Sequence, residues 1–83
     1  MRTAAELKLG EKAIIKDIDN THPSSHRILE IGFTPGQEIV LLTKSIFNDP
    51  IGLSIRGTIF AIRKNEASCI IIWLRHLQKI KFH

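Results

Sequence analysis

The chain has 83 residues, of which 43% are hydrophobic and 24% charged, and its formal net charge is +4. This balance excludes a disordered chain, and the length fits one small domain without room for a deep catalytic cleft. The single cysteine, Cys69, excludes an intramolecular disulfide and a cysteine-based metal framework. A net positive charge is consistent with binding to an acidic protein, a nucleic acid or an anionic membrane surface, and it is equally consistent with a role in solubility alone.

The sequence carries no signal for export or membrane insertion. No apolar segment of the signal-peptide kind opens the chain, and the longest apolar run, residues 69–74, is well short of the ~18 residues of a membrane span. We therefore expect a cytoplasmic protein with one domain over residues 1–83. Its core is expected at residues 7–75 and its basic tail at 76–83.

The first elements are a helical turn and a strand. Thr3 and Glu6 have the spacing of a capping box, which predicts one short helical turn at the start of the chain. Residues 12–18 alternate as a strand does. The alternation assigns one strand face to Ile14, Lys16 and Ile18.

A short helix is predicted next. The polar stretch 17–25 leads into it, Pro23 suits its first turn, and Thr21 or Ser24 would cap it. Its apolar positions are Ile28, Leu29 and Ile31. Gly32 falls where a helix ends in a left-handed residue, so that Phe33 would pack on Ile28.

The middle of the chain reads as three strands. Thr34 to Gln37 has the sequence of a type II turn, and residues 38–44 form a strand with apolar residues on both faces, which predicts cover on both sides. A loop over 45–50 precedes a strand at 51–56 whose alternation turns Ile51, Leu53 and Ile55 inward. Gly57 and Thr58 then suit a type II′ hairpin turn before a strand at 59–63.

The last elements are a polar helical turn at 64–68 and a strand at 69–74. We expect Arg63 and Glu66 to pair near this turn, and Cys69 to pack as a small hydrophobic residue. The fold class predicted is mostly β: a closed or nearly closed barrel of five short strands, with one short α-helix between strands 1 and 2.

The order of several short motifs resembles the FeoA family. The matching stretches are Leu7-x-x-Gly10, Arg27-x-Leu29-x-x-Gly32-Phe33-Thr34-Pro35-Gly36, Asn48-Asp49-Pro50-Ile51 and Arg56-Gly57-x-x-x-Ala61-Ile62-Arg63-x-x-Glu66-Ala67-x-x-Ile70-x-Ile72. They span residues 7–72. The sequence departs from the family at Leu9, where proline is frequent, and at Asn48, which stands for glycine but tolerates the same left-handed turn.

The resemblance implies an SH3-like five-stranded barrel without catalytic residues. It also implies a cytosolic accessory protein that binds and modulates a FeoB-type membrane transporter of ferrous iron, which carries a GTPase domain. The chain would then be peripheral to the bacterial inner membrane through this partner. Neither a nucleic-acid partner nor a resident cofactor is expected, although binding of Fe²⁺ or another divalent metal stays open, as does a homo-oligomer.

Candidate metal ligands are few. His22 and His26 have the i, i+4 spacing that puts two imidazoles on one helix face, and Asp19 is near them in sequence. Pro23, however, places His22 at or before the first turn. The alternative is therefore two solvated histidines near the start of a helix.

The candidate partner-binding residues are apolar or charged side chains near loops. Leu29 lies off the line of Ile28 and Ile31, and Phe47 lies in the loop after the second strand, so each is either an exposed anchor or a core residue. The hypothesised surface comprises Ile28, Leu29, Phe47, Asp49 and Arg56. A third apolar set, Leu77, Ile80 and Phe82, lies in the tail and suits an edge strand, a dimer contact or a partner contact.

Two rival functions remain open from the sequence. A small basic barrel that binds nucleic acid would stack bases on exposed aromatic residues. The aromatic residues of the chain are few: Phe33, Phe47, Phe60, Phe82 and Trp73. Most of them fall at expected core positions. A metal-responsive sensor module would use His22 and His26.

Overall fold

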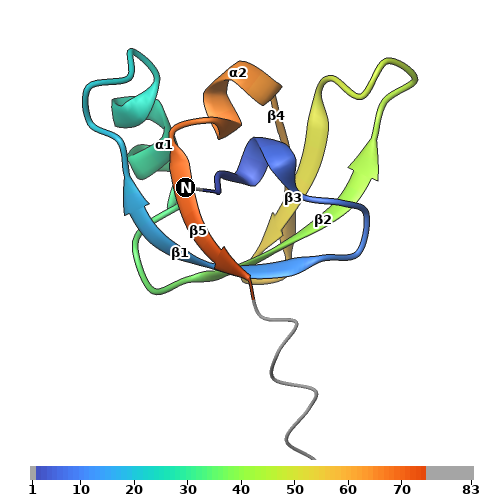
Figure 1. Cartoon of the computed structure of the whole chain (residues 1–83), viewed down its shortest axis with the longest axis horizontal. Coiled ribbons are helices and arrows are strands. Elements are labelled where there is room, and N and C mark those ends of the chain that lie inside the picture. Colours follow the sequence, from blue (N-terminus) through green and yellow to red (C-terminus); the bar gives the residue numbers. More distant parts are fainter. Residues whose placement is uncertain (1, 75–83) are drawn as a thin grey trace, which may run out of the picture.

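A computed structural model describes residues 2–74 and shows five antiparallel strands in one sheet, in the order β4-β3-β2-β1-β5 (Figure 1). The strands are β1 (Lys12–Ile18), β2 (Glu38–Lys44), β3 (Ile51–Ile55), β4 (Thr58–Ile62) and β5 (Ile70–Leu74). The helices are the 3-10 turn η1 (Ala4–Glu6), α1 (Ser25–Ile31) and α2 (Lys64–Ala67). The predicted fold class is confirmed, including the helix between the first two strands. The predicted tail, residues 76–83, lies outside the described residues.

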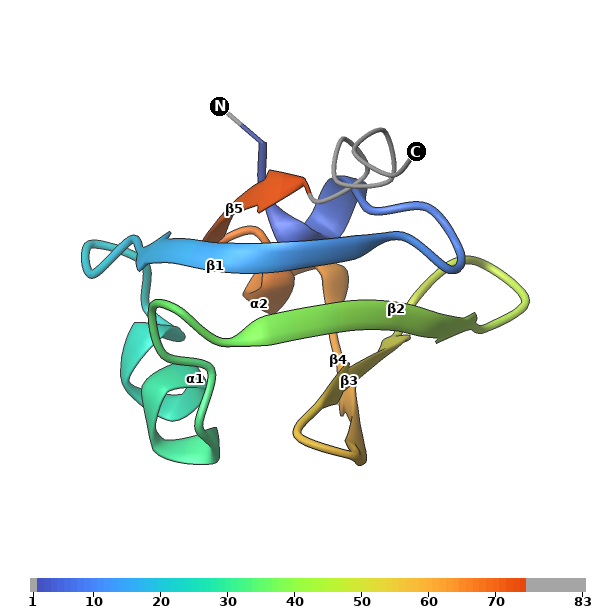
Figure 2. The ribbon, with the colours of Figure 1, turned by 90° about the horizontal axis from the view of Figure 1, so that it is seen from below.

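The sheet curls around a single apolar core, and α2 and η1 fill the opening between its two ends (Figure 1). Figure 2 shows β1 and β2 side by side, with β5 beyond β1 and β3 beyond β2. The edge of β5 is partly covered by the start of the chain, because Thr3 bridges Ile71 and the Ile72 amide donates a hydrogen bond to the Arg2 carbonyl. Within residues 2–74, no helix has the length and apolarity needed to cross a membrane.

The predicted alternation of β1 is wrong at its end. The alternation put Ile18 on the face of Ile14 and Lys16, but Ile18 is buried together with Ala13 and Ile15, which lie on the other face. The cause is a shift in the pairing with β5 between Ile15 and Asp17, which leaves Lys16 as an extra residue. A bulge of this kind reverses which side chains point inward for the rest of the strand.

The outer face of β2 is not covered, contrary to the prediction. Ile39 and Leu41 are buried in the core, whereas Val40 is half-buried and Leu42 is exposed. The pairing of β2 with β3 shifts between Leu41 and Thr43, so that Leu42 lies at a bulge. Apolar residues on both faces of a strand therefore did not indicate cover on both sides.

The β3–β4 hairpin turns one residue earlier than predicted. Ile55 pairs with Thr58, which leaves Arg56 and Gly57 as the two turn residues. Both have positive φ, 49° and 81°, as a type I′ turn requires, so the predicted type II′ turn at Gly57 and Thr58 is wrong. Type I′ turns match the right-handed twist of the strands, and this gain offsets the cost of placing an arginine in the left-handed region.

The end of α1 follows the prediction. Gly32 has φ 117°, and the Phe33 amide donates a 3.2 Å hydrogen bond to the Ile28 carbonyl. Ile28 and Phe33 are both fully buried. The start of α1 differs, because Ser24 occupies the cap position without a side-chain hydrogen bond to the helix. The helix is therefore held mainly by its buried face and by its glycine end.

Candidate partner-binding surface

One end of the barrel carries α1, α2 and the loop from Ser45 to Pro50, and we call it the helical end (Figure 1). The three segments are far apart in the sequence, and α2 lies between the other two in the view of Figure 1. The polar contacts described next connect α2 to both neighbours, so the helical end is built as a unit.

The loop from Ser45 to Pro50 is shaped by its own polar atoms. The Ser45 hydroxyl accepts a 2.9 Å hydrogen bond from the Asp49 amide and donates a 2.6 Å bond to the Asp49 carbonyl. Asn48 adopts the left-handed conformation with φ 63°, as predicted, and the Asp49–Pro50 peptide is cis. The loop therefore has a defined shape that displays the two residues at its tip, Ile46 and Phe47.

Asp49 links this loop to α2. Its Oδ1 accepts a 2.9 Å hydrogen bond from the backbone amide of Lys64, the first residue of α2. The backbone of the loop itself is bonded by the Ser45 side chain, which leaves the Asp49 carboxylate to bond α2. A carboxylate at a helix start satisfies an amide that has no partner within the helix.

Glu66 links α2 to α1. Its Oε1 accepts a 3.0 Å hydrogen bond from the Arg63 amide, and its Oε2 forms an ion pair with the Arg27 guanidinium. The predicted pairing of Glu66 with Arg63 thus involves the backbone of Arg63, and the charge partner is Arg27. Burial raises the pKa of Glu66, but the hydrogen bonds from Arg63 and Arg27 outweigh it and lower the pKa below the ordinary 4.5.

We expect Glu66→Gln to destabilise the protein by about 0.5–1 kcal/mol at neutral pH. Glutamine at this position still accepts the Arg63 amide, so the loss is that of the ion pair with Arg27. Because the folded pKa is lowered, the contribution is fully present above about pH 4.5 and disappears as the pH falls through the folded value. Urea unfolding between pH 7 and pH 3 measures the free energy of unfolding of both proteins, and the difference between the two should shrink as the pH falls. Glu30→Gln, which removes a charge from the exposed surface of α1, is the control. If the stability difference between wild type and Glu66→Gln persisted at pH 3, it would not come from the ion pair with Arg27.

The exposed apolar residues of the helical end are Leu29, Ile46 and Phe47. Leu29 on α1 is 39% exposed, and Ile46 and Phe47 at the loop tip are 86% and 87% exposed. Ile28, which we predicted as part of this surface, is fully buried and faces the core. The helix α1 has only two turns, and the residues on its inward side pack against the barrel.

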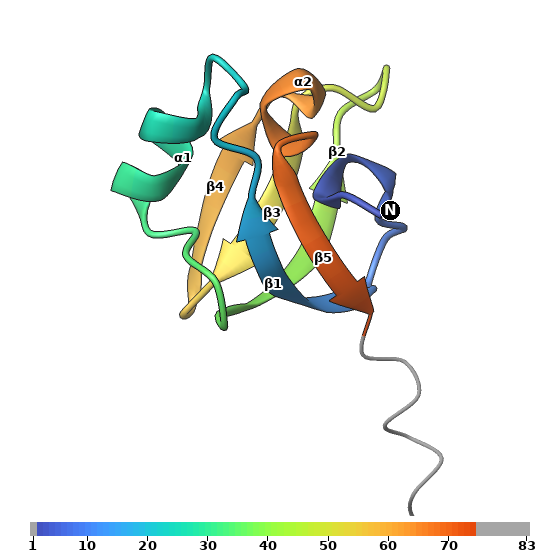
Figure 3. The ribbon, with the colours of Figure 1, turned by 60° about the vertical axis from the view of Figure 1, so that its left-hand side comes forward.

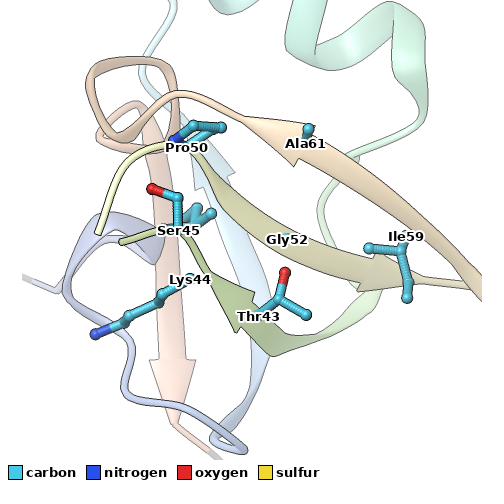
Figure 4. Close-up of a pocket in the computed structure, with 8 residues that line it drawn as sticks. Thr43, Lys44, Ser45, Pro50, Gly52, Ile59 and Ala61 are labelled. Carbon is cyan, nitrogen blue, oxygen red and sulfur yellow. The ribbon is translucent and has the colours of Figure 1, made fainter. Parts of the chain in front are cut away.

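A shallow pocket of about 320 Å³ lies beside the base of the loop, on the outer side of β2, β3 and β4 (Figure 4). Gly52 forms part of its wall, since a side-chain carbon there would overlap Thr43 and crowd Ile59. Lys44, Ser45, Pro50, Ile51 and Ala61 complete the lining. The lining is apolar apart from Lys44 and two hydroxyls, which suits contact with an apolar side chain or an extended segment of a partner.

Arg56 lies away from the loop, against the end of α1. A side-chain carbon placed on Gly32 would lie 2.5 Å from Arg56 Nη2, so the guanidinium rests where Gly32 has no side chain. Its positive charge therefore lies near the C-terminal carbonyl groups of α1, where a cation is favoured. Gly32 thus has two roles: it adopts the left-handed conformation that ends the helix, and it leaves space for the Arg56 guanidinium.

The two candidate metal ligands do not share a helix face. His22 precedes α1, which begins at Ser25, and its Nδ1 accepts a 3.0 Å hydrogen bond from the Ser24 amide. Its Nε2 lies 3.4 Å from the Ser68 hydroxyl, while Asp19 is engaged with Thr21. Over residues 2–74, no three histidine, cysteine, aspartate or glutamate side chains are grouped to hold a metal ion.

Cys69 packs as predicted. It is fully buried beside the core, and burial raises the pKa of its thiol, with the charge of Asp19 acting in the same direction. The thiol is therefore protonated and apolar at neutral pH.

Comparison with known proteins gives a consistent result. The family model of the FeoA domain matches residues 2–73. A crystal structure of FeoA from Stenotrophomonas maltophilia, complexed with zinc, is 26% identical with a TM-score of 0.77, covering 87% of this chain and 89% of that one. An NMR structure of a FeoA-like protein from Clostridium acetobutylicum is 28% identical with a TM-score of 0.80, covering 84% and 81%.

Two other comparisons add less. The crystal structure of IdeR from T. acidophilum has a TM-score of 0.69 at 20% identity, covers 87% of this chain and 33% of its own, and shows a shared fold alone. No curated relative matches the chain by sequence.

Proposed function

Because the chain belongs to the FeoA family, we propose that it is a non-enzymatic accessory protein of bacterial ferrous iron uptake. In support, the FeoA of S. maltophilia is described as an SH3 domain protein and a candidate activating factor of ferrous iron transport. The partner proposed is a FeoB-type membrane iron transporter with a GTPase domain. The chain would bind it from the cytoplasm and modulate transport, and this role needs no bound metal.

The observation that carries the proposal is the pair of nearly fully exposed apolar residues at the tip of a defined loop. Ile46 and Phe47 project from a turn fixed by Ser45 and tied to α2 through Asp49. Leu29, on the same end of the barrel, adds a third apolar contact. Exposed aromatic and aliphatic anchors on a rigid support are what protein interfaces bury at their centres.

We expect Phe47→Glu to weaken binding to the transporter by at least about 30-fold, because a central aromatic anchor contributes about 2 kcal/mol or more. Leu29→Glu is expected to have a smaller effect in the same direction, since Leu29 is the less exposed residue. The measurement is the affinity of the purified full chain for the detergent-solubilised transporter, determined by biolayer interferometry.

Leu9→Glu is the matched control, because Leu9 is an exposed apolar residue outside the helical end. Circular dichroism of each variant checks that the barrel is intact. Unchanged binding by folded Leu29→Glu and Phe47→Glu would refute the surface. Absence of binding by the wild-type chain would refute the partner itself.

A further inference from the structure

The strand β4 forms one margin of the sheet and has no strand on its outer side (Figure 3). At the opposite margin, the edge of β5 is partly covered because Thr3 bridges Ile71. Within residues 2–74, no comparable bridge covers the edge of β4. The backbone of this edge is therefore the part of the sheet that can still pair with an added strand.

The register of the β3–β4 hairpin determines which backbone groups of β4 point away from β3. The two-residue turn places its closing pair, Ile55 and Thr58, in the hydrogen-bonded position. Opposed residues of an antiparallel pair alternate between bonded and non-bonded positions. Every second residue of β4 from Thr58 onward therefore bonds β3, whereas the amides and carbonyls of Ile59 and Ala61 point to the open edge. Outside the strand ladder, these two residues make no backbone hydrogen bond within residues 2–74.

The side chains of the same two residues line the shallow pocket on the outer side of the sheet (Figure 4). Ile59 is 55% exposed, and Ala61 is exposed as well. Gly52 pairs with Ala61 and leaves space in the pocket, since a side-chain carbon at Gly52 would overlap Thr43. A strand added beside β4 would place every second side chain next to Ile59 and Ala61, within reach of this pocket.

The surroundings of this edge are basic. Residues 51–65, which contain β3 and β4, include three basic residues and no acidic residue. Lys44 lines the pocket and Lys64 follows β4, and neither forms an ion pair with a carboxylate of residues 2–74. The nearest acidic residues in the sequence, Asp49 and Glu66, are engaged with the Lys64 amide and with α1. The positive charge near the edge therefore favours an acidic partner.

We propose that the open edge of β4 binds an extended acidic segment of another protein, which adds a further strand to the sheet. Main-chain hydrogen bonds to Ile59 and Ala61 hold the segment, its apolar side chains contact the pocket, and its carboxylates face Lys44 and Lys64. The inference does not depend on the proposed transporter partner and is tested without it.

A second copy of the chain fits this edge less well. Antiparallel pairing of two β4 edges about Phe60 would bring Arg56 of each copy close to Lys64 of the other. Like charges opposed across paired strands are destabilising. Nucleic acid is also less suitable, because the alternating amides and carbonyls of the edge match a peptide backbone and the pocket beside them is largely apolar.

Amide exchange measured by NMR tests the open edge directly. In the full chain, the amides of Ile59 and Ala61 should exchange rapidly with deuterium, whereas β3 protects those of Phe60 and Ile62. Protection of Ile59 and Ala61 in a dilute sample would overturn the proposal, because the edge would then be occupied already. Protection that appears only at high protein concentration would overturn it in favour of a second copy.

A synthetic peptide tests the partner chemistry. The probe is a fluorescein-labelled peptide of about eight residues in which valine and glutamate alternate. We expect saturable binding by fluorescence anisotropy, and exchange at Ile59 and Ala61 slowed at least about tenfold in the complex. A peptide that alternates valine and lysine is the matched control and should not bind. Equal binding of both peptides, or of neither, would overturn the proposal. A single-stranded oligonucleotide that bound where the acidic peptide did not would overturn it in favour of nucleic acid.

Two pairs of variants locate the site. Ala61→Pro removes an edge amide that β3 does not use and should weaken peptide binding at least about fivefold, the value of one backbone hydrogen bond. Ala61→Ser keeps the amide and should change the affinity less than about twofold. Circular dichroism checks that both variants fold. Equal affinity of the folded Ala61→Pro and Ala61→Ser variants would overturn the pairing with β4.

Charge reversal supplies the second pair. Lys44→Glu with Lys64→Glu should weaken binding of the acidic peptide at least about fivefold, because each exposed ion pair contributes up to about that factor. Lys12→Glu with Lys16→Glu makes the same change of net charge on β1 and should have a smaller effect. Equal losses in the two double variants would show that net charge alone attracts the peptide, and would overturn the site.

Discussion

Replacing Phe33 by alanine is expected to lower the free energy of unfolding by about 3–5 kcal/mol. The Phe33 side chain is fully buried and meets the ring of Phe60 edge to face, with ring centres 5.8 Å apart and planes inclined by 69°. The substitution removes this contact and leaves a cavity between α1 and the sheet. Because small domains unfold at about 5–15 kcal/mol, the loss is a large part of the total stability. Guanidinium unfolding followed by circular dichroism measures it.

Phe33→Leu separates volume from ring geometry. Leucine keeps most of the apolar contact but loses the edge-to-face pairing, so we expect it to recover more than half of the stability lost in Phe33→Ala. Ser54→Ala, a change at a half-buried β3 residue outside the core, should alter the midpoint little. A loss below about 1 kcal/mol for Phe33→Ala would mean that the core does not depend on this residue.

Phe33 also illustrates which parts of the fold could be predicted. Gly32, Phe33 and the turn from Thr34 to Gln37 lie within a few residues of one another, and their conformations follow from local chemistry. Gly32 has the left-handed conformation expected, and the Gln37 amide bonds the Thr34 carbonyl around Gly36 at φ 93°. The bounds of β1 and β2 were predicted correctly for the same reason, since turns flank both strands.

The errors came from registers that depend on neighbouring strands. The bulge at Lys16 belongs to the pairing of β1 with β5, and no feature of residues 12–18 alone indicates it. The hairpin presents the same problem, since Arg56-Gly57 and Gly57-Thr58 both contain the required glycine. The pairing of Ile51 with Ile62 and of Leu53 with Phe60 selects the first of these turns.

The candidate surface was predictable only in part. Phe47 and Leu29 were identified from the sequence as potential anchors, and the structure places both at the helical end with exposed side chains. The contacts that hold this end together join residues far apart in sequence. Asp49 bonds a residue 15 positions away, and Arg27 pairs with Glu66 at 39 positions. Such partners depend on the fold and leave no local pattern.

The exposure of Trp73 was also missed. Trp73 was counted among the aromatic residues that mostly fall at expected core positions, whereas only Ile70 and Ile72 of β5 are buried. An aromatic residue between Ile72 and Leu74 in an edge strand therefore does not indicate a core position.

The neighbours Ile28 and Leu29 give the sharpest contrast between core and surface. Ile28→Asp is expected to abolish folding at 25 °C, because the side chain is fully buried and a carboxylate there would have neither water nor a partner. Leu29→Asp, one position along the same helix, should retain the far-ultraviolet spectrum and most of the stability, since Leu29 is 39% exposed. Soluble yield and thermal unfolding monitored by circular dichroism measure both.

Ile28→Val controls for the change of residue without a change of polarity. It removes one methylene group and should cost about 0.5–1.5 kcal/mol, so the protein stays folded. If Ile28→Asp folded as well as Leu29→Asp, then α1 would not be seated as described and Ile28 would return to the candidate surface. If Leu29→Asp failed to fold, Leu29 would be a core residue, and the helical end would lose one of its three apolar contacts.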